Sequence, residues 1–158
     1  EAELISDAAL AQSESQRLEF WALREAIGAA FIEDKSSIKS DTAVPISEIA
    51  TSIQSTTARL AVYLSGIRCA PFGHAGDGNI HFNVLRPETM TPDDFIAHVP
   101  EIRRILDEEA LKFGGTISAE HGIGSLKSAS LAICQSTVER RVMQQLRVMR
   151  WAVAVNWR

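Results

Sequence analysis

The segment His74-Ala-Gly-Asp-Gly-Asn-Ile-His81 limits the fold of this chain more than any other stretch. Within it, Asp77-Gly78 is the dipeptide favoured in two-residue loops of β-hairpins, and β-prone residues flank it on both sides. With these two residues as the loop, His74 is expected directly opposite His81. Opposed residues of a hairpin have Cβ atoms about 5 Å apart, which allows two imidazoles to hold one metal ion. The hairpin alone also fits an ordinary sheet whose two histidines bind nothing, so both interpretations stay open here.

Composition narrows the class of protein. A chain of 158 residues that is 46% hydrophobic and 23% charged has the composition of a globular domain with its own core. The formal net charge of -4 comes without a basic stripe, which argues against nucleic acid and against an anionic membrane surface as partners. No apolar run approaches the roughly 20 residues that a membrane-spanning helix needs. We therefore expect a single cytoplasmic domain.

Hydrophobic periodicity and turn residues predict an α+β fold. The expected elements, in chain order, are a helix over 8–32, a strand over 36–46, a helix from Ser47 to Gly66, hairpin strands over 67–74 and 79–86, a helix over 91–113 that Pro100 could interrupt, a loop over 116–130, and a last helix through 138–149. This order favours an antiparallel sheet with helices covering one face.

A second informative stretch is Gly114-Gly-Thr-Ile-Ser-Ala-Glu-His-Gly-Ile-Gly124, where a carboxylate and an imidazole stand side by side among glycines. Glycines allow a backbone to approach a ligand closely, so such a loop suits a binding site. Glu120 could join the two histidines in a three-ligand metal site that leaves one coordination position open. His121 would then serve as a proton acceptor. The alternative is that Glu120 only caps the loop and His121 is an ordinary polar residue.

These two motifs together resemble a known family. GHAGDGNIHFNV at 73–84 and GGTISAEHGIGSLK at 114–127 are similar to segments of the C-terminal cap domain of FAD-linked oxidases that act on D-2-hydroxy acids. The group includes the FAD subunit of glycolate oxidase, D-lactate dehydrogenase and D-2-hydroxyglutarate dehydrogenase. Residues 21–45 also resemble the family pattern, so the similarity extends over about 18–146.

The resemblance implies a metal site and a base. In metal-dependent members, the positions of His74, His81 and Glu120 hold a divalent ion, usually zinc or manganese. His121 matches the residue that relatives use as a base beside the flavin. On this basis the hydroxyl proton of the substrate passes to His121, and a hydride passes from its Cα to the flavin.

The resemblance also implies substrate-binding residues. Arg24 and Lys39 match positions that bind the substrate carboxylate, for which a guanidinium and an ammonium are suited. Without the family resemblance, both residues would be interpreted as exposed charges on a helix or a strand. Asn83 matches a residue close to the substrate, and the expected register pairs it with Phe72 on the face of the histidines. The alternative for Asn83 is a buried amide that bonds to backbone.

For the whole chain, the resemblance implies a ferredoxin-like cap domain that is incomplete at both ends. Residues 1–158 are expected to form a partial C-terminal substrate domain, with FAD bound mainly by a domain absent from this chain. The isolated chain is therefore expected to be inactive, and to self-associate through apolar surface left exposed.

Two other functions stay open. One is a non-catalytic fragment or binding module from a truncated gene. The other is a metallohydrolase that uses the histidines and Glu120 to activate water.

Overall fold

The computed structural model describes residues 6–33, 37–124 and 127–155, with the backbone alone for 29–33, 129, 133 and 149–155. The chain divides into two compact units, Glu1–Ser37 and Ile38–Arg158. The expectation that residues 1–158 form one partial domain stays a prediction.

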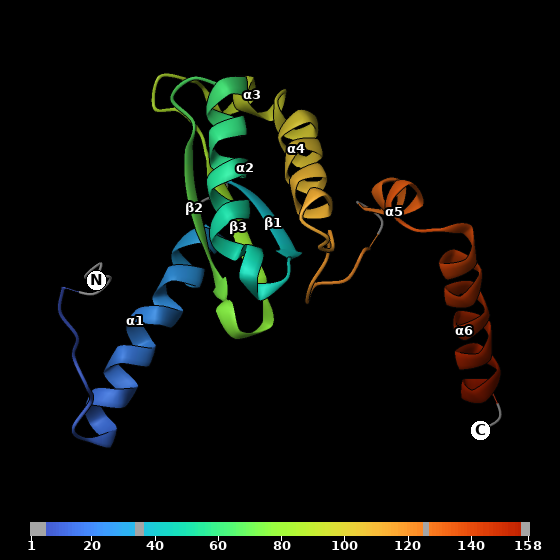
Figure 1. The fold of residues 1–158 in the computed structure, drawn as a ribbon, viewed down its shortest axis with the longest axis horizontal. Coiled ribbons are helices and arrows are strands. Elements are labelled where there is room, and N and C mark those ends of the chain that lie inside the picture. Colours follow the sequence, from blue (N-terminus) through green and yellow to red (C-terminus); the bar gives the residue numbers. More distant parts are fainter. Residues whose placement is uncertain (1–5, 34–36, 125–126, 156–158) are drawn as a thin grey trace. The chain divides into compact units, whose positions relative to one another are not determined.

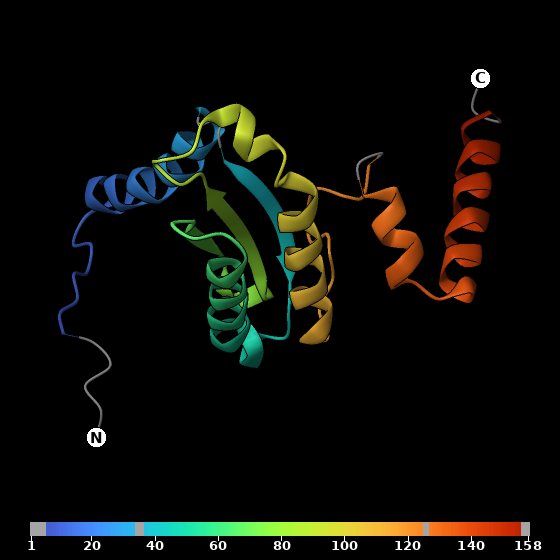
Figure 2. The same cartoon turned by 90° about the horizontal axis from the view of Figure 1, so that it is seen from above.

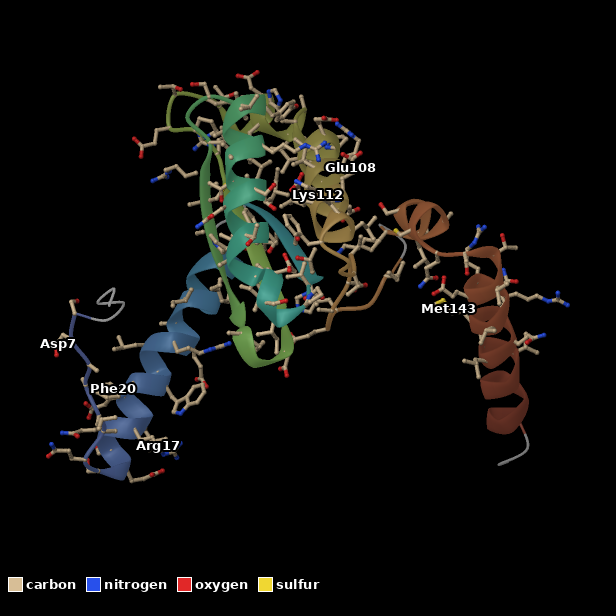
Figure 3. The ribbon with its side chains drawn as sticks, in the orientation of Figure 1. Asp7, Arg17, Phe20, Glu108, Lys112 and Met143 are labelled. Carbon is tan, nitrogen blue, oxygen red and sulfur yellow. The ribbon has the colours of Figure 1, made fainter. Side chains whose placement is uncertain are left out.

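The first unit contains helix α1 (Glu14–Glu33). The helix begins after Ser13, whose hydroxyl accepts the Gln16 backbone N–H at 3.2 Å, a common way to cap a helix. The expected start at residue 8 was therefore too early. Several of its apolar side chains are exposed, among them Phe20, which Figure 3 labels on this helix. Self-association through such surface stays a prediction.

The second unit is built on a three-stranded antiparallel sheet with the order β1-β3-β2 (Figure 1). Its strands are β1 (Ile38–Ala43), β2 (Arg68–His74) and β3 (Asn79–Leu85). Its helices are η1 (Ile46–Glu48), α2 (Ile49–Tyr63), α3 (Pro92–Ile96), α4 (Val99–Lys112), α5 (Ser128–Cys134) and α6 (Thr137–Val155). Helices α2 and α4 cover one face of the sheet (Figure 2). The expected α+β class, with helices on one face of an antiparallel sheet, is confirmed.

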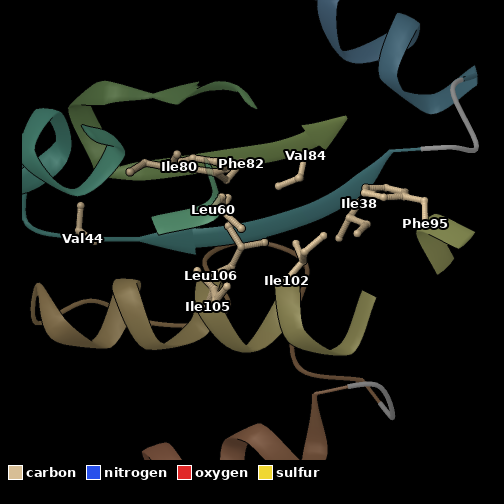
Figure 4. Close-up of a cluster of buried hydrophobic side chains, with 10 residues drawn as sticks. All are labelled: Ile38, Val44, Leu60, Ile80, Phe82, Val84, Phe95, Ile102, Ile105 and Leu106. Carbon is tan, nitrogen blue, oxygen red and sulfur yellow. The ribbon is translucent and has the colours of Figure 1, made fainter. Parts of the chain in front are cut away.

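The hydrophobic core lies between that face and helices α2 and α4. Its buried side chains are Ile38, Val44, Leu60, Ile80, Phe82, Val84, Phe95, Ile102, Ile105 and Leu106 (Figure 4). Because strand side chains alternate, the neighbours of these residues on β1 and β3 point to the opposite face. That face carries polar residues, including Asp41, His81 and Asn83.

The hairpin turn differs from its expected form. The loop is residues 75–78, made of η2 (Ala75–Asp77) and Gly78, and not 77–78 alone. His74 therefore pairs with Asn79, and His81 pairs with Phe72. The predicted direct pairs of His74 with His81, and of Asn83 with Phe72, are wrong. The register has moved by an even number of residues, so every side chain keeps its expected face and the two histidines lie diagonally on one surface.

A contact from outside the hairpin explains the longer loop. Gly78 has φ of +71°, and its carbonyl accepts the Val44 N–H at 3.0 Å. The turn is thus held against the chain that follows β1. This contact cannot be predicted from the turn preferences of the local residues.

Three expected boundaries of the helices differ from those in the structure. The expected helix over 91–113 is divided between Ile96 and Val99, and Pro100 lies in the first turn of α4, where no N–H is needed. The expected cap at Ser47 is wrong, because this residue lies inside η1 and α2 begins after Glu48. The expected loop over 116–130 ends early, since α5 begins at Ser128.

A substitution at Ile102 tests whether this side chain contributes to the hydrophobic core. Its side chain is completely buried on α4, whereas Ile96 on α3 is 63% exposed. Ile102→Val should lower the free energy of unfolding by about 1 kcal/mol, because a buried methylene is lost and a small void remains. The matched Ile96→Val should change it by less than about 0.5 kcal/mol. Urea unfolding followed by circular dichroism measures both, and equal effects would show that Ile102 is not in the core.

Glu109 is a buried carboxylate that links α4 to α2 through partly exposed partners. Its side chain is 4% exposed, and its carboxylate accepts hydrogen bonds from Ser55 Oγ at 2.7 Å, Arg59 Nη1 at 3.1 Å and Lys112 Nζ at 3.1 Å. Figure 3 labels Lys112 one turn from Glu108 on this helix. Burial alone would raise the pKa of Glu109, but the three donors outweigh it and hold the pKa below its ordinary value.

This shift predicts that acid weakens the fold. A carboxylate with a depressed folded pKa stabilises the chain above its ordinary value, and that stabilisation is lost as pH falls through the folded pKa. Between about pH 5 and 3, the unfolding free energy should fall less steeply in Glu109→Gln than in the unaltered chain. Glu88→Gln serves as control, because Glu88 is 81% exposed in its 3.4 Å pair with Arg68. Unfolding curves across this range with identical slopes for the three chains would contradict the assignment.

Candidate functional site

Two histidines meet on the polar face of the sheet. His74 ends β2 and His81 lies within β3, with ring centroids 5.9 Å apart in an edge-to-face arrangement. The His81 side chain is 15% exposed and the His74 side chain 42% exposed. The diagonal register therefore brings the imidazoles together even though they are not directly paired.

Glu120 closes this pair from a distant loop. Its Oε1 lies 3.6 Å from His74 Nε2, and its Oε2 lies 3.6 Å from His81 Nε2. One donor atom from each of the three residues lies within 4.8 Å of the other two. Ligands about 2 Å from a tetrahedral zinc ion are roughly 3.3 Å from one another. The two 3.6 Å separations between Glu120 and the histidines are close to this spacing, whereas the set as a whole extends to 4.8 Å.

The loop reaches the site because it is fixed at the edge of β1. Thr116 N donates to the Ala43 carbonyl at 2.8 Å, and Ala43 N donates to the Thr116 carbonyl at 3.1 Å. Gly115 allows this approach, since a Cβ there would lie 2.1 Å from the Ala43 carbonyl oxygen. The glycines of the second motif thus position the backbone that carries Glu120.

Asp41 belongs to the site, although no motif in the sequence assigns it a role there. It lies on β1 opposite His81, and it is 3% exposed. Its Oδ2 accepts three successive backbone N–H groups, from Ala119 at 3.2 Å, Glu120 at 2.8 Å and His121 at 2.8 Å. The sequence does show Asp41 as a charged residue inside an expected strand. Its position next to the histidines, however, follows only from the pairing of β1 with β3.

Asp41 also interacts with side chains of the site. Its Oδ1 accepts the Asn79 amide at 2.9 Å and lies 3.7 Å from His81 Nδ1. Burial raises the pKa of Asp41, but the N–H groups of His121 and Glu120, the Asn79 amide and the charge of His121 lower it, and the pKa lies below its ordinary value. The carboxylate is therefore ionised at neutral pH.

Burial is the largest influence on His81 and lowers its pKa. The charges of Asp41 and Glu120 oppose this shift, while those of His121 and His74 add to it. The ordinary pKa of histidine is already near 6.5, so His81 is neutral at pH 7, which is the form that binds metals.

His121 stacks on His81, with ring centroids 5.6 Å apart and planes inclined by 16°. Its side chain is 69% exposed, and its Nδ1 lies 3.7 Å from Asp41 Oδ2. An accessible imidazole thus lies beside the three donor residues. Its use as a base stays a prediction.

None of the three expected substrate-binding residues belongs to the cluster of His74, His81 and Glu120. Arg24 is on α1, in the first of the two units, whereas the cluster belongs to the second. Lys39 lines a cavity of about 150 Å³ beside α4, together with Arg103 and Lys127. Asn83 is 3% exposed and its amide donates to the Ala70 carbonyl at 3.4 Å, as the alternative interpretation of this residue expected. Their roles toward a substrate stay predictions.

Comparison with known proteins shows that the sequence matches one protein family. A family model described as FAD linked oxidases, C-terminal domain, matches residues 1–149. The chain is 35% identical over 143 residues to a D-2-hydroxyglutarate dehydrogenase of Xanthomonas citri pv. viticola, covering 90% of this chain and 30% of the relative. It is 32% identical over 139 residues to a D-lactate dehydrogenase of Anaerostipes hadrus, covering 87% and 29%. It is 36% identical over 116 residues to the glycolate oxidase subunit GlcD of Bacillus subtilis, covering 70% and 23%.

The chain therefore spans about a third or less of the length of these relatives. Among its described residues, none of the helices combines the length and the apolar character required to cross a bilayer.

Proposed function

Because the chain belongs to the family of FAD-linked oxidases, through their C-terminal domain, we propose that it is the substrate- and metal-binding cap domain of a flavin-dependent enzyme. The proposed reaction is oxidation of a D-2-hydroxy acid to the 2-oxo acid. Relatives with three different names, for D-2-hydroxyglutarate, D-lactate and glycolate, support this substrate class. The observation that carries the proposal is the meeting of His74, His81 and Glu120.

These three residues are proposed to hold a divalent ion, zinc or manganese. Two imidazoles and a carboxylate suit either metal, and three protein ligands leave a coordination position for a substrate oxygen. Their side chains remain 15 to 47% exposed, so a small acid can reach the position. When bound, the ion supplies Lewis acidity toward a hydroxyl oxygen and the flavin supplies a hydride acceptor.

The residues of the chain then have distinct tasks. His121 is proposed to accept the hydroxyl proton at Nε2, because its Nδ1 faces the Asp41 carboxylate. Arg24 and Lys39 are proposed to bind the substrate carboxylate, which orients the Cα–H bond. Asn83 lies on the same sheet face as His81 and is proposed to line the substrate site.

Nuclear relaxation tests whether a hydroxy acid binds at this site. Mn²⁺ is paramagnetic, so protons of a molecule bound beside it relax faster. With the Mn²⁺-loaded chain, the Cα proton of D-lactate should relax faster than in the same Mn²⁺ solution with a His74→Ala, His81→Ala variant. Equal relaxation rates in the two samples would contradict the proposal.

The other two functions predict different results. A metallohydrolase would cleave ester or amide substrates with metal and without flavin, whereas the oxidase proposal expects no such hydrolysis. A binding module from a truncated gene would bind the hydroxy acid, but its reading frame would have no flavin domain. Membership of an FAD-linked family favours the oxidase over these two functions. A cytoplasmic location is also part of the proposal.

A further inference from the structure

Asp41 occupies a position between the two segments that supply the site. On one side it contacts the hairpin through Asn79 and lies near His81. On the other side it accepts the backbone N–H groups of residues 119–121, which carry Glu120 and His121. Three N–H groups converging on one carboxylate oxygen form a strong, charge-assisted anchor.

Among the described residues, the groups found within hydrogen-bonding distance of this carboxylate are all donors. Oδ2 receives three N–H groups and Oδ1 receives the Asn79 amide. His81 Nδ1 lies 3.7 Å from Oδ1, while its Nε2 lies 3.6 Å from Glu120. Both ring nitrogens of His81 face a carboxylate, but the Asp41 side chain is 4% exposed and the Glu120 side chain is 47% exposed. Water screens the repulsion between a lone pair and Glu120 more than that between a lone pair and Asp41, so the proton belongs on Nδ1. The lone pair of Nε2 then points toward Glu120.

We infer that Asp41 is a positioning residue, which fixes the Nδ1–H tautomer of His81 and holds the 119–121 backbone so that Glu120 faces Nε2. A carboxylate that orients a ligand histidine in this way commonly raises metal affinity. This inference rests on the proposed function for its consequence, metal binding, but the tautomer is a property of the metal-free chain.

Asparagine keeps the size of Asp41 but removes its charge and replaces one acceptor oxygen with a donor NH₂ group. If its oxygen keeps the three backbone N–H groups, the NH₂ group takes the place of Oδ1, where it faces the Asn79 amide and His81 Nδ1. Asp41→Asn should therefore disturb the tautomer of His81 and weaken Zn²⁺ binding by about 10- to 100-fold. Asp77→Asn is the matched control, because it removes a charge from the exposed turn of the same hairpin.

Two measurements on the whole chain test the inference. Long-range ¹H–¹⁵N spectra of the metal-free chain give the tautomer, and competition with a chromophoric chelator gives Zn²⁺ affinity. We expect His81 as Nδ1–H in the unaltered chain and in Asp77→Asn, and a mixed or Nε2–H form with weaker Zn²⁺ binding in Asp41→Asn.

The outcomes separate the inference from the proposed function. An Nε2–H form in the unaltered chain would overturn the role of Asp41 even if Asp41→Asn fails to fold. Unchanged tautomer and affinity in a folded Asp41→Asn would overturn it as well. If the unaltered chain shows Nδ1–H but binds no Zn²⁺, the tautomer assignment holds and the proposed metal site fails.

Discussion

His81→Ala is expected to weaken Zn²⁺ binding by about 100- to 1,000-fold. Structural zinc sites are worth roughly 10 to 16 kcal/mol over four ligands, so one ligand contributes about 2.5 to 4 kcal/mol. His81 is the least exposed of the three donor residues, and its pKa is lowered, so few protons compete with the metal at neutral pH. Chelator competition at pH 7 measures the change.

The control for this prediction removes an imidazole elsewhere. His98 precedes α4, and its Nδ1 lies 2.7 Å from the Tyr63 hydroxyl, away from the cluster of His74, His81 and Glu120. His98→Ala should leave Zn²⁺ affinity within about twofold of the unaltered chain, a change of roughly 0.4 kcal/mol, because His98 is not one of the three donor residues. If both variants lose the same affinity, zinc is bound outside the cluster or the variants are unfolded.

Gly78→Ala is expected to lower the free energy of unfolding by about 3 kcal/mol. The φ of +71° costs a residue with a Cβ roughly 1 to 2 kcal/mol. In addition, a Cβ at this position would lie 2.0 Å from the Val44 carbonyl oxygen, so the turn must shift away from the strand end. Because the same turn follows His74, Zn²⁺ affinity should fall with stability. Urea unfolding and chelator competition measure the two effects.

Gly76→Ala is the matched control in the same loop. A Cβ at Gly76 meets nothing within 4 Å, and its φ is not positive. We expect its unfolding free energy to stay within about 0.5 kcal/mol of the unaltered chain. Similar losses in the two variants would mean that the loop as a whole, and not the contact of Gly78 with Val44, resists substitution.

The faces of the strands could be predicted from the sequence, whereas the register could not. Alternation of side chains placed His74 and His81 on one surface, and this holds for any register that differs by an even number of residues. The choice of loop depends on Gly78 meeting Val44, and this contact joins residues 34 positions apart. A local preference for Asp77-Gly78 cannot contain it.

The difference between local patterns and long-range contacts also explains which site residues could be predicted from the sequence. Glu120 was expected because the second motif placed a carboxylate among glycines, and the structure brings it to both histidines. Asp41 was missed because its partners come from residues 79, 81 and 119–121, which lie near it only after β1 pairs with β3. Arg24 and Lys39 carry no local pattern that distinguishes a substrate ligand from a surface charge.

X-ray absorption at the zinc edge tests the central claim most directly, because it reports the atoms around the ion. For the chain loaded with one equivalent of Zn²⁺, we predict nitrogen and oxygen neighbours at about 2.0 to 2.1 Å with the outer-shell scattering of two imidazoles. That imidazole scattering should be lost in the His74→Ala, His81→Ala variant. Sulfur neighbours at about 2.3 Å, or an oxygen-only shell that the double substitution leaves unchanged, would contradict the account.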